Sequence, residues 1–318
     1  MPAPPRVLVI RGGAIGDFIL TLPAIRLLRE NIPGAHIEIL GYKPIVALAV
    51  AGGLADATRD LDHASMARLF VPKAELDEAL CDYFRSFSLV VSYLFDPDSI
   101  LKGNMEAIGV KTFLEASHQV APGAGHASRQ LARPLQRLAM FLEDPAARLD
   151  IAAPSPPERP LVVLHPGSGS QQKNWSVANW VRLGGALKKA FPNVDLALVT
   201  GEAEAERGIT PAILEGWRGH SFVHWDQLPL TELATRLASC LAFIGHDSGI
   251  SHLAAACGLP CLLFFGPTDP ATWAPAGSDI RTVVAPAGDL RELCYEEGMA
   301  AAEKFVREIV EKKSAPPL

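Results

Sequence analysis

A cluster of prolines near the middle of the chain limits its architecture more than any other feature. Residues 154–160 read Pro-Ser-Pro-Pro-Glu-Arg-Pro. Proline has no backbone N–H and a fixed φ, so this stretch cannot continue a helix or a central strand. We therefore expect a linker at 154–160 between an amino-terminal domain, residues 1–153, and a carboxy-terminal domain, residues 161–318. The length of 318 residues suits two domains of ordinary size.

Both halves open in the same way, with a short apolar run followed directly by a glycine-bearing loop. The runs are 6–10 and 161–164, and continuous β-branched runs of this kind are typical of parallel strands buried on both faces. Strand and helix patterns then alternate, which predicts an α/β fold made of two Rossmann-like, doubly wound domains. In such sheets ligands bind beyond the carboxyl ends of the strands. The further strand candidates are 37–40, 89–91, 196–200, 241–244 and 261–265, and the helix candidates are 20–30, 178–190, 230–239, 250–257 and 290–312.

Composition excludes several classes of protein. Hydrophobic residues make up 49% and charged residues 20%, and the longest apolar stretches, such as 45–51 and 259–265, fall far short of the ~18 residues of a membrane span. The amino terminus does not resemble a signal peptide, so we expect a cytoplasmic protein. Five cysteines without a CxxC pair indicate reduced, buried thiols. The net charge of −6 is spread over both halves, which argues against a nucleic-acid partner.

The first loop places a carboxylate where a nucleotide fingerprint would have glycines and amides. It reads Arg-Gly-Gly-Ala-Ile-Gly-Asp from Arg11 to Asp17, and Gly13 and Gly16 flank the turn into the helix. No acidic residue ends the next strand to hold a ribose, so NAD or FAD is not expected here. Two interpretations of Asp17 stay open. It caps the helix by accepting backbone N–H bonds, or it is a general base that takes a proton from an acceptor hydroxyl.

The second loop, 165–175, is rich in hydrogen-bond donors. Ser168 and Lys173 could meet a phosphate there, although a loop lysine that only faces solvent is the alternative. Farther along, Glu202 follows Gly201 at a strand end, where it could bridge two ribose hydroxyls. The alternative is an acid that merely favours the start of a helix, since Glu204 and Glu206 follow it.

The segment 245–256 is the strongest single feature. A strand ends near Ile244 and a small-residue helix begins near Ile250, so the amides of Ser248, Gly249 and Ile250 are predicted to face a bound anion. His252 falls in the first turn, where a structural role is equally open. His246, Asp247 and His252 come nearest to a metal-ligand pattern, but their spacing does not fit one, and no metal is expected.

Taken together, these residues resemble glycosyltransferase family 9, the ADP-heptose:lipopolysaccharide heptosyltransferases and their relatives. The resemblance is carried by four segments in order along the chain: 16–23, 165–175, 201–202, and 247–252 with 266–270. It implies a GT-B fold, with two Rossmann-like domains facing each other across a cleft and a last helix that returns to the first domain.

The resemblance also implies roles for residues at the matching positions. Ser168 and Lys173 would contact the phosphates of an ADP-sugar, Glu202 its ribose and Leu228 its adenine. Asp247 would face the sugar, and the amides of 248–250 and His252 the pyrophosphate. Asp17 would be the base in a one-step inverting transfer that uses neither metal nor cofactor.

The chain departs from the family pattern in its first half. Residues 92–98 are acidic and interrupted by proline where the family shows a basic, serine-bearing stretch, so the acceptor is less well supported than the donor. A lipopolysaccharide-type or other glycan acceptor is expected, with at most peripheral contact with the inner membrane. Five basic residues could still converge to contact its phosphates: Arg59, Arg68, Lys73, Lys102 and Lys111.

Two other functions fit the same scaffold. One is a nucleotide-sugar epimerase or hydrolase, which would need further acid and base groups. The other is a non-catalytic nucleotide-sugar-binding protein. The presence of both Asp17 and Lys173 favours a transferase, because a binding module has no need of a base opposite the donor.

Overall fold

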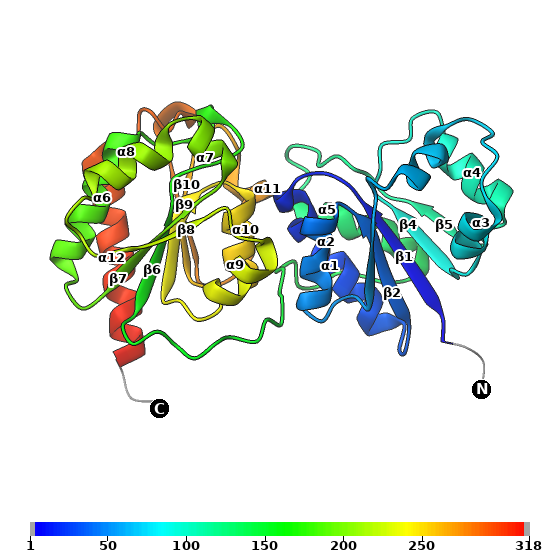
Figure 1. Ribbon diagram of the computed structural model, residues 1–318, viewed down its shortest axis with the longest axis horizontal. Helices are drawn as coiled ribbons and strands as arrows, with labels where there is room; N and C mark the ends of the chain where they lie inside the picture. Colours follow the sequence, from blue (N-terminus) through cyan, green and yellow to red (C-terminus); the bar gives the residue numbers. More distant parts are fainter. Residues whose placement is uncertain (1–3, 315–318) are drawn as a thin grey trace. The chain divides into compact units, whose positions relative to one another are not determined.

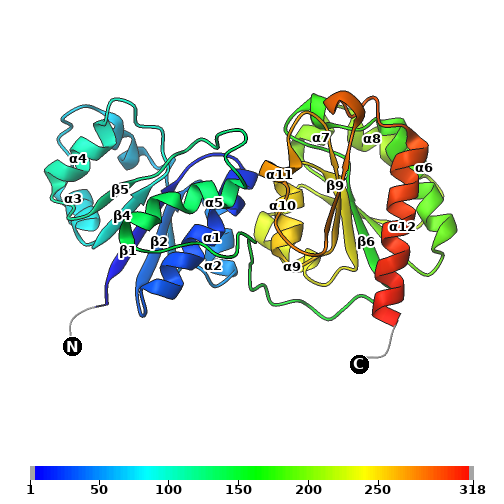
Figure 2. The same cartoon turned by 180° about the vertical axis from the view of Figure 1, so that it is seen from behind.

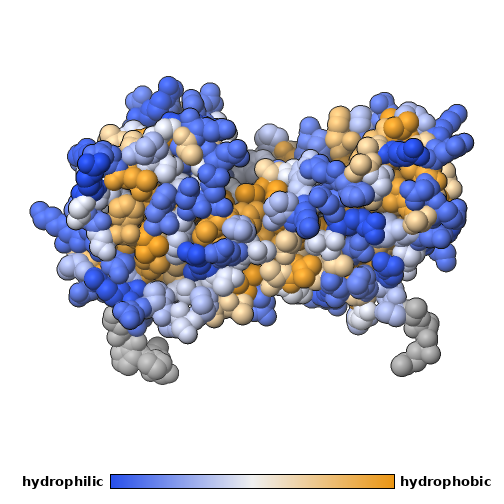
Figure 3. All heavy atoms as spheres, in the orientation of Figure 1, coloured by the Kyte–Doolittle hydropathy of each residue, from blue (hydrophilic) through white to orange (hydrophobic). Residues whose placement is uncertain are grey.

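The computed structural model describes residues 4–314, which fall into two compact units, 1–150 and 151–318 (Figure 1). Each unit is a parallel sheet with helices on both faces, and the view from behind shows the same layering (Figure 2). No helix among the described residues is long and apolar enough to cross a membrane. On the face of each unit seen in Figure 3, hydrophilic residues are interspersed with smaller hydrophobic patches.

The first unit has five parallel strands in the order β3-β2-β1-β4-β5. The central strand β1 is buried over Val7–Ile10 because both of its faces are covered by helices. Its elements are β1 (Arg6–Arg11), α1 (Ile15–Asn31), β2 (His36–Gly41), α2 (Lys43–Ala51), β3 (Ala57–Asp60), the 3-10 helix η1 (Ala64–Phe70), α3 (Glu78–Arg85), β4 (Leu89–Ser92), α4 (Ile100–Ile108), β5 (Phe113–Glu115), α5 (Ala127–Ala132) and the 3-10 helix η2 (Arg133–Leu138).

Alternate side chains of the first sheet enter two different cores. Leu8, Ile10 and Val90 point toward η1, α3 and α4, where they pack with residues such as Met66 and Phe84. Helices α1 and α5 pack against one another elsewhere in this unit. Helix α1 begins at Ile15, earlier than the predicted start at Leu20, so Asp17 lies in its first turn.

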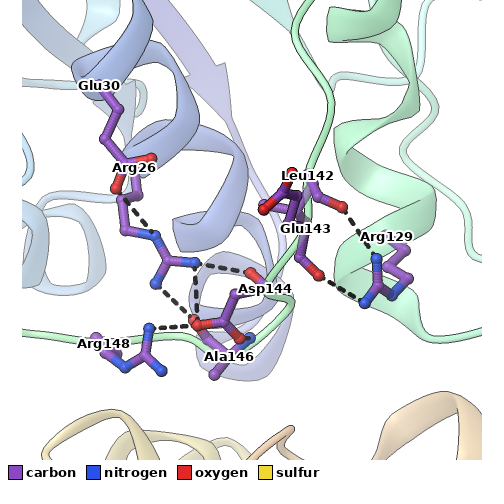
Figure 4. A network of polar contacts seen from close by, with 8 residues as sticks. All are labelled: Arg26, Glu30, Arg129, Leu142, Glu143, Asp144, Ala146 and Arg148. Carbon is purple, nitrogen blue, oxygen red and sulfur yellow. Dashed lines mark hydrogen bonds and ion pairs between the residues drawn. The ribbon is translucent and has the colours of Figure 1, made fainter.

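Two arginines hold the segment that leaves the first unit. Arg26 of α1 donates to the carbonyls of Asp144 (2.7 Å) and Ala146 (2.9 Å), and Arg129 of α5 donates to those of Leu142 (2.9 Å) and Glu143 (2.7 Å) (Figure 4). The segment 142–146 has no regular secondary structure of its own. Its backbone carbonyls are therefore satisfied by side chains, which fixes it to the first unit.

The second unit has six parallel strands in the order β11-β10-β9-β6-β7-β8. Its elements are β6 (Leu161–His165), the 3-10 helix η3 (Gln171–Lys173), α6 (Val177–Ala190), β7 (Asp195–Thr200), α7 (Glu202–Glu206), α8 (Ile209–Gly216), β8 (Val223–Asp226), α9 (Leu230–Leu237), β9 (Ala242–His246), α10 (Gly249–Ala256), β10 (Cys261–Phe265), α11 (Pro270–Trp273), β11 (Ile280–Val284), the 3-10 helix η4 (Pro286–Gly288) and α12 (Tyr295–Ser314).

One expectation about this unit needs correction. Strand β9 runs through His246 rather than ending near Ile244, because Gly245 pairs with His165 of β6 and His246 with Phe264 of β10. His246 is therefore buried in the sheet and not part of a loop. Helix α12 buries Phe305 in the core of its own unit, with residues of β6, β9 and α6. Its expected contact with the first domain stays a prediction.

Candidate functional site

Two of the predicted donor-binding residues, Lys173 and Asp247, meet at the carboxyl edge of the second sheet. The Lys173 ammonium donates to Asp247 Oδ2 at 2.6 Å, and the Thr268 hydroxyl donates to the same oxygen at 2.6 Å. Asp247 is 8% exposed, so its charge is nearly removed from water and is balanced by Lys173. The structure thus brings together Lys173 and Asp247, two residues singled out from the sequence, and adds Thr268 of the segment 266–270, to which no role was assigned.

Ser168 is buried inside the loop that follows β6. Its hydroxyl lies 2.6 Å from Asn174 Oδ1 and 2.7 Å from the Ser170 carbonyl, and its single proton can serve only one of them at a time. Arg207 donates to the carbonyls of Ser168 (2.7 Å) and Gly169 (3.3 Å). The side chain of Ser168 thus stabilises the loop as it stands, and Arg207 is a second support that the sequence analysis did not find.

The buried acid after β7 is Glu204, whereas Glu202, the predicted ribose ligand, is exposed at the start of α7. Glu204 Oε2 accepts the Gly201 N–H at 2.7 Å. A Cβ on Gly167 would lie 1.7 Å from Glu204 Oε1, so only glycine fits there. Burial lowers the pKa of His165, and the nearby Glu204 charge opposes that shift. Glu204 is thus a structural support between two strand-end loops. The sequence does not reveal this role, because Glu204 lies in a run of acidic residues that looks exposed.

The amino end of α10 is capped from within. Ser248 is the N-cap, and its hydroxyl accepts the Ser251 N–H at 3.3 Å. Gly249 and Ile250 are half-exposed, whereas His252 is buried. Leu228, the predicted adenine contact, is half-buried in the turn after β8. The eight-residue helix therefore presents its first turn at the edge where Asp247 lies.

Asp17 of the first unit does cap its helix. Its Oδ2 accepts the Ala14 N–H at 3.0 Å, and a Cβ on Gly13, which has φ +93°, would lie 3.0 Å from that oxygen. Gly16 lies in the same first turn. The other oxygen, Oδ1, is 3.8 Å from Nη2 of Arg11, and the side chain remains 41% exposed. The capping bond therefore leaves Oδ1 available, so the hypothesis that Asp17 is a base stays open.

Arg11, the last residue of β1, was not singled out from the sequence. Its side chain is 4% exposed, and its guanidinium lies 5.6 Å from the Tyr93 ring and donates to the Asp17 carbonyl at 3.2 Å. Its Nε finds no hydrogen-bond partner among the described residues. Burial lowers the pKa of Arg11, and the charge of Asp17 opposes that shift most strongly. Asp17 is thus the counter-ion of a buried cation.

Three of the basic residues predicted to contact an acceptor are engaged by other partners. Arg59 lies over the Tyr83 ring and 3.7 Å from Glu38, Arg68 donates to the Glu75 carbonyl, and Lys102 pairs with Glu115. Lys73 instead lines a cavity of about 580 Å3 between the segment 72–76, α3 and α4. The acidic turn 92–98 has a local reason, because Asp96 accepts the N–H groups of Ile100, Leu101 and Lys102 and so caps α4.

Within residues 4–314, no group of three or more His, Cys, Asp or Glu side chains is arranged to hold a metal ion. His246 and Asp247 are adjacent, but the carboxylate is engaged by Lys173 and Thr268, and the imidazole accepts a backbone N–H from Trp175 at 2.9 Å.

Comparisons with known sequences agree on one family. The model of glycosyltransferase family 9 (heptosyltransferase) matches residues 116–300. Lipopolysaccharide heptosyltransferase 1 of Pseudomonas aeruginosa is 27% identical over 305 aligned residues, covering 83% of this chain and 79% of that protein.

Solved structures of that family share the fold. A family 9 glycosyltransferase from Veillonella parvula superposes with a TM-score of 0.78 at 16% identity, over 96% of this chain and 97% of that one. The Escherichia coli heptosyltransferase WaaC, solved with ADP, gives 0.71 at 18% identity, over 96% and 99%.

Proposed function

This chain belongs to glycosyltransferase family 9, the heptosyltransferase family, and from that premise we propose that it moves a heptose-like sugar from an ADP-sugar to a glycan hydroxyl, with inversion and without a metal. Family membership makes it a glycosyltransferase. The observation that carries the finer proposal is the cluster of Lys173, Asp247 and Thr268 beside the first turn of α10.

The donor half of the proposal rests on that cluster. A diphosphate needs a cation and backbone donors, and Lys173 and the amino end of α10 supply both at one sheet edge. ADP is favoured as the nucleotide because WaaC, which has the same fold, has been solved with ADP. Lys173 is 27% exposed and can exchange its contact with Asp247 for one with an incoming phosphate.

In the chemical step one proton is transferred, one bond forms and one bond breaks. Asp17 Oδ1 takes the proton of the acceptor hydroxyl, and the acceptor oxygen forms a bond to the anomeric carbon. The bond between that carbon and the phosphate oxygen breaks, and ADP leaves with the electron pair. Lys173 and the α10 amides stabilise the negative charge that develops on the diphosphate, which is the role a metal ion has in other transferases.

The test begins with thermal unfolding in the presence of ADP, UDP, GDP or NAD, without metal and with EDTA. A ligand at 100 times its Kd adds about 2.7 kcal/mol to the free energy of unfolding, so the midpoint should rise with ADP alone. A shift with UDP or GDP would keep the fold and change the sugar. The absence of any shift would contradict the donor site.

Turnover is then measured with ADP-heptose and lipopolysaccharide-core acceptors, again with EDTA. The anomeric configuration of the product, read by NMR, should be inverted relative to the donor. Retention of configuration would exclude Asp17 as the base of a one-step displacement, and loss of turnover with EDTA would exclude the metal-free mechanism.

A further inference from the structure

The loop 166–175 carries Ser168 and Lys173, yet it contains only one short 3-10 turn, η3. Its position therefore depends on contacts with the rest of the unit. One of these contacts is made by a residue outside the family motifs, the fully buried His246 at the end of β9. We propose that His246 is a positioning residue that holds the carboxyl end of this loop and so keeps Lys173 against Asp247. This inference rests on the proposed function, because it concerns the same nucleotide site.

The direction of the hydrogen bonds fixes the chemical state of the imidazole. Nε2 lies 2.9 Å from the Trp175 backbone nitrogen and 3.3 Å from Trp180 Nε1, and both of those groups can only donate. Nε2 must therefore carry the lone pair, which leaves the proton on Nδ1. Nδ1 has no hydrogen-bond partner among the described residues. One ring thus links Trp175 at the end of the loop to Trp180 of α6.

The order of residues along the chain explains how the bond to Trp175 positions Lys173. His246 and Asp247 are consecutive, and Trp175 follows Lys173 by two residues. His246 accepts the backbone N–H of Trp175, while Asp247 accepts the ammonium of Lys173 at 2.6 Å. The bond from Trp175 to His246 anchors the backbone of the loop. The anchored backbone then brings the Lys173 side chain within reach of Asp247. Without the first bond, Lys173 would have to find Asp247 from a mobile loop.

The surroundings make the imidazole hard to replace. Its ring lies edge-on to Trp180 at 5.1 Å and 6.3 Å from Phe264, and Trp175 contacts both of these rings. Water cannot reach the Trp175 N–H in place of His246, so loss of the acceptor would leave that group buried without a partner. Burial lowers the pKa of His246 to about 3, and the charge of His165 acts in the same direction, so the ring remains a neutral acceptor near neutral pH.

The experiment compares the full chain with His246→Phe, which fills the space without an acceptor, and His246→Gln, whose amide oxygen can reach the Trp175 N–H. Phe264→Leu is the matched control, since it disturbs the same aromatic packing but keeps the bond. ADP affinity is measured by calorimetry, each variant also in the Lys173→Met background. Hydrogen exchange of the loop 166–175 is measured without nucleotide, which makes that readout independent of the donor.

We expect His246→Phe to weaken ADP binding about tenfold, His246→Gln to restore most of it, and Phe264→Leu to leave it unchanged. In the Lys173→Met background, His246→Phe should have little further effect, because both changes remove the same contact. Exchange in the loop should accelerate in His246→Phe only. An additive effect in the double variant, or an unchanged exchange rate, would overturn the inference.

Failure of the proposed function would look different. If wild-type protein does not bind ADP, the nucleotide assignment is wrong, while the exchange rates still decide whether His246 holds the loop. If wild-type binds ADP and Lys173→Met weakens it, but His246→Phe does not, the donor site stands and the inference about His246 is wrong.

Discussion

The two units hold their key charges in opposite ways. In the first, the cation is buried and the anion is exposed: Arg11 is 4% accessible and its partner Asp17 41%. In the second, the anion is buried and the cation is the more accessible: Asp247 is 8% exposed and Lys173 27%. In each pair the buried member fixes the exposed one, and the exposed member is the group that the proposed reaction uses. A carboxylate is offered to a hydroxyl proton, and an ammonium to a diphosphate.

The sharpest way to break this comparison is Asp17→Asn. We expect turnover to fall about 10³-fold through loss of the base, with ADP affinity unchanged. The free energy of unfolding should also drop by about 1–3 kcal/mol, because Arg11 stays buried without a counter-charge. Initial rates and urea unfolding measure the two effects.

A double variant separates these two roles of Asp17. Arg11→Met with Asp17→Asn removes both charges and should recover stability but not turnover. If Asp17→Asn alone keeps its turnover, Asp17 is a capping residue and counter-ion only, and the base lies elsewhere.

The corresponding change in the second unit is Lys173→Met, for which we expect a smaller effect. ADP should bind about 10–100-fold more weakly, since a charge-assisted contact is worth about 1.5–3 kcal/mol. Adenosine, which lacks the diphosphate, is the control ligand, and calorimetry should show its affinity unchanged. Equal losses for ADP and adenosine would mean that Lys173 shapes the site rather than binding phosphate.

The buried histidines of the second unit predict that the free energy of unfolding falls in acid, an effect that the loop 11–17 of the first unit should not have. When folding lowers the pKa of a histidine below its ordinary value of 6.5, the unfolded chain takes up a proton at a higher pH than the folded protein does. The contribution of that histidine to the free energy of unfolding is therefore fully present above pH 6.5 and is lost as the pH falls. With the pKa of His246 at about 3, the loss between pH 7 and pH 5 is about 2 kcal/mol. Urea unfolding at both pH values should show a smaller drop for His246→Gln than for wild-type. Equal drops would show that His246 does not contribute.

Thr268→Val should give the smallest effect. It removes one of the two donors to Asp247 Oδ2 but leaves Lys173 on the same oxygen, so we expect a loss of about 1 kcal/mol in unfolding free energy. Thr268→Ser keeps the hydroxyl and should restore it. If the valine variant is as stable as wild-type, Lys173 alone is enough to hold the buried carboxylate.

The alternation of apolar runs and glycine loops was sufficient to predict two parallel-sheet domains, because strands buried on both faces leave a clear local pattern. The same reasoning brought Lys173 and Asp247 to one sheet edge. It missed Arg11 and Glu204, whose burial depends on partners distant in sequence. It also ended β9 near Ile244, two residues before its true end at His246, because a polar residue after glycine looks like the start of a loop. Only the pairing with β10 shows that it is not.

The arginine contacts to the segment 142–146 also limit the length of chain that is free to move as a linker. Leu149 packs on Gly52, and the Asp150 N–H donates to the Gly52 carbonyl, so the tether proper begins only after residue 150. Residues 152–160 are exposed and carry four prolines, and such chains extend by about 3.1 Å per residue as stiff spacers. The connection is therefore a short, stiff linker whose first residue is fixed to the first unit. Lengthening it with glycine and serine would make it more flexible without changing either core.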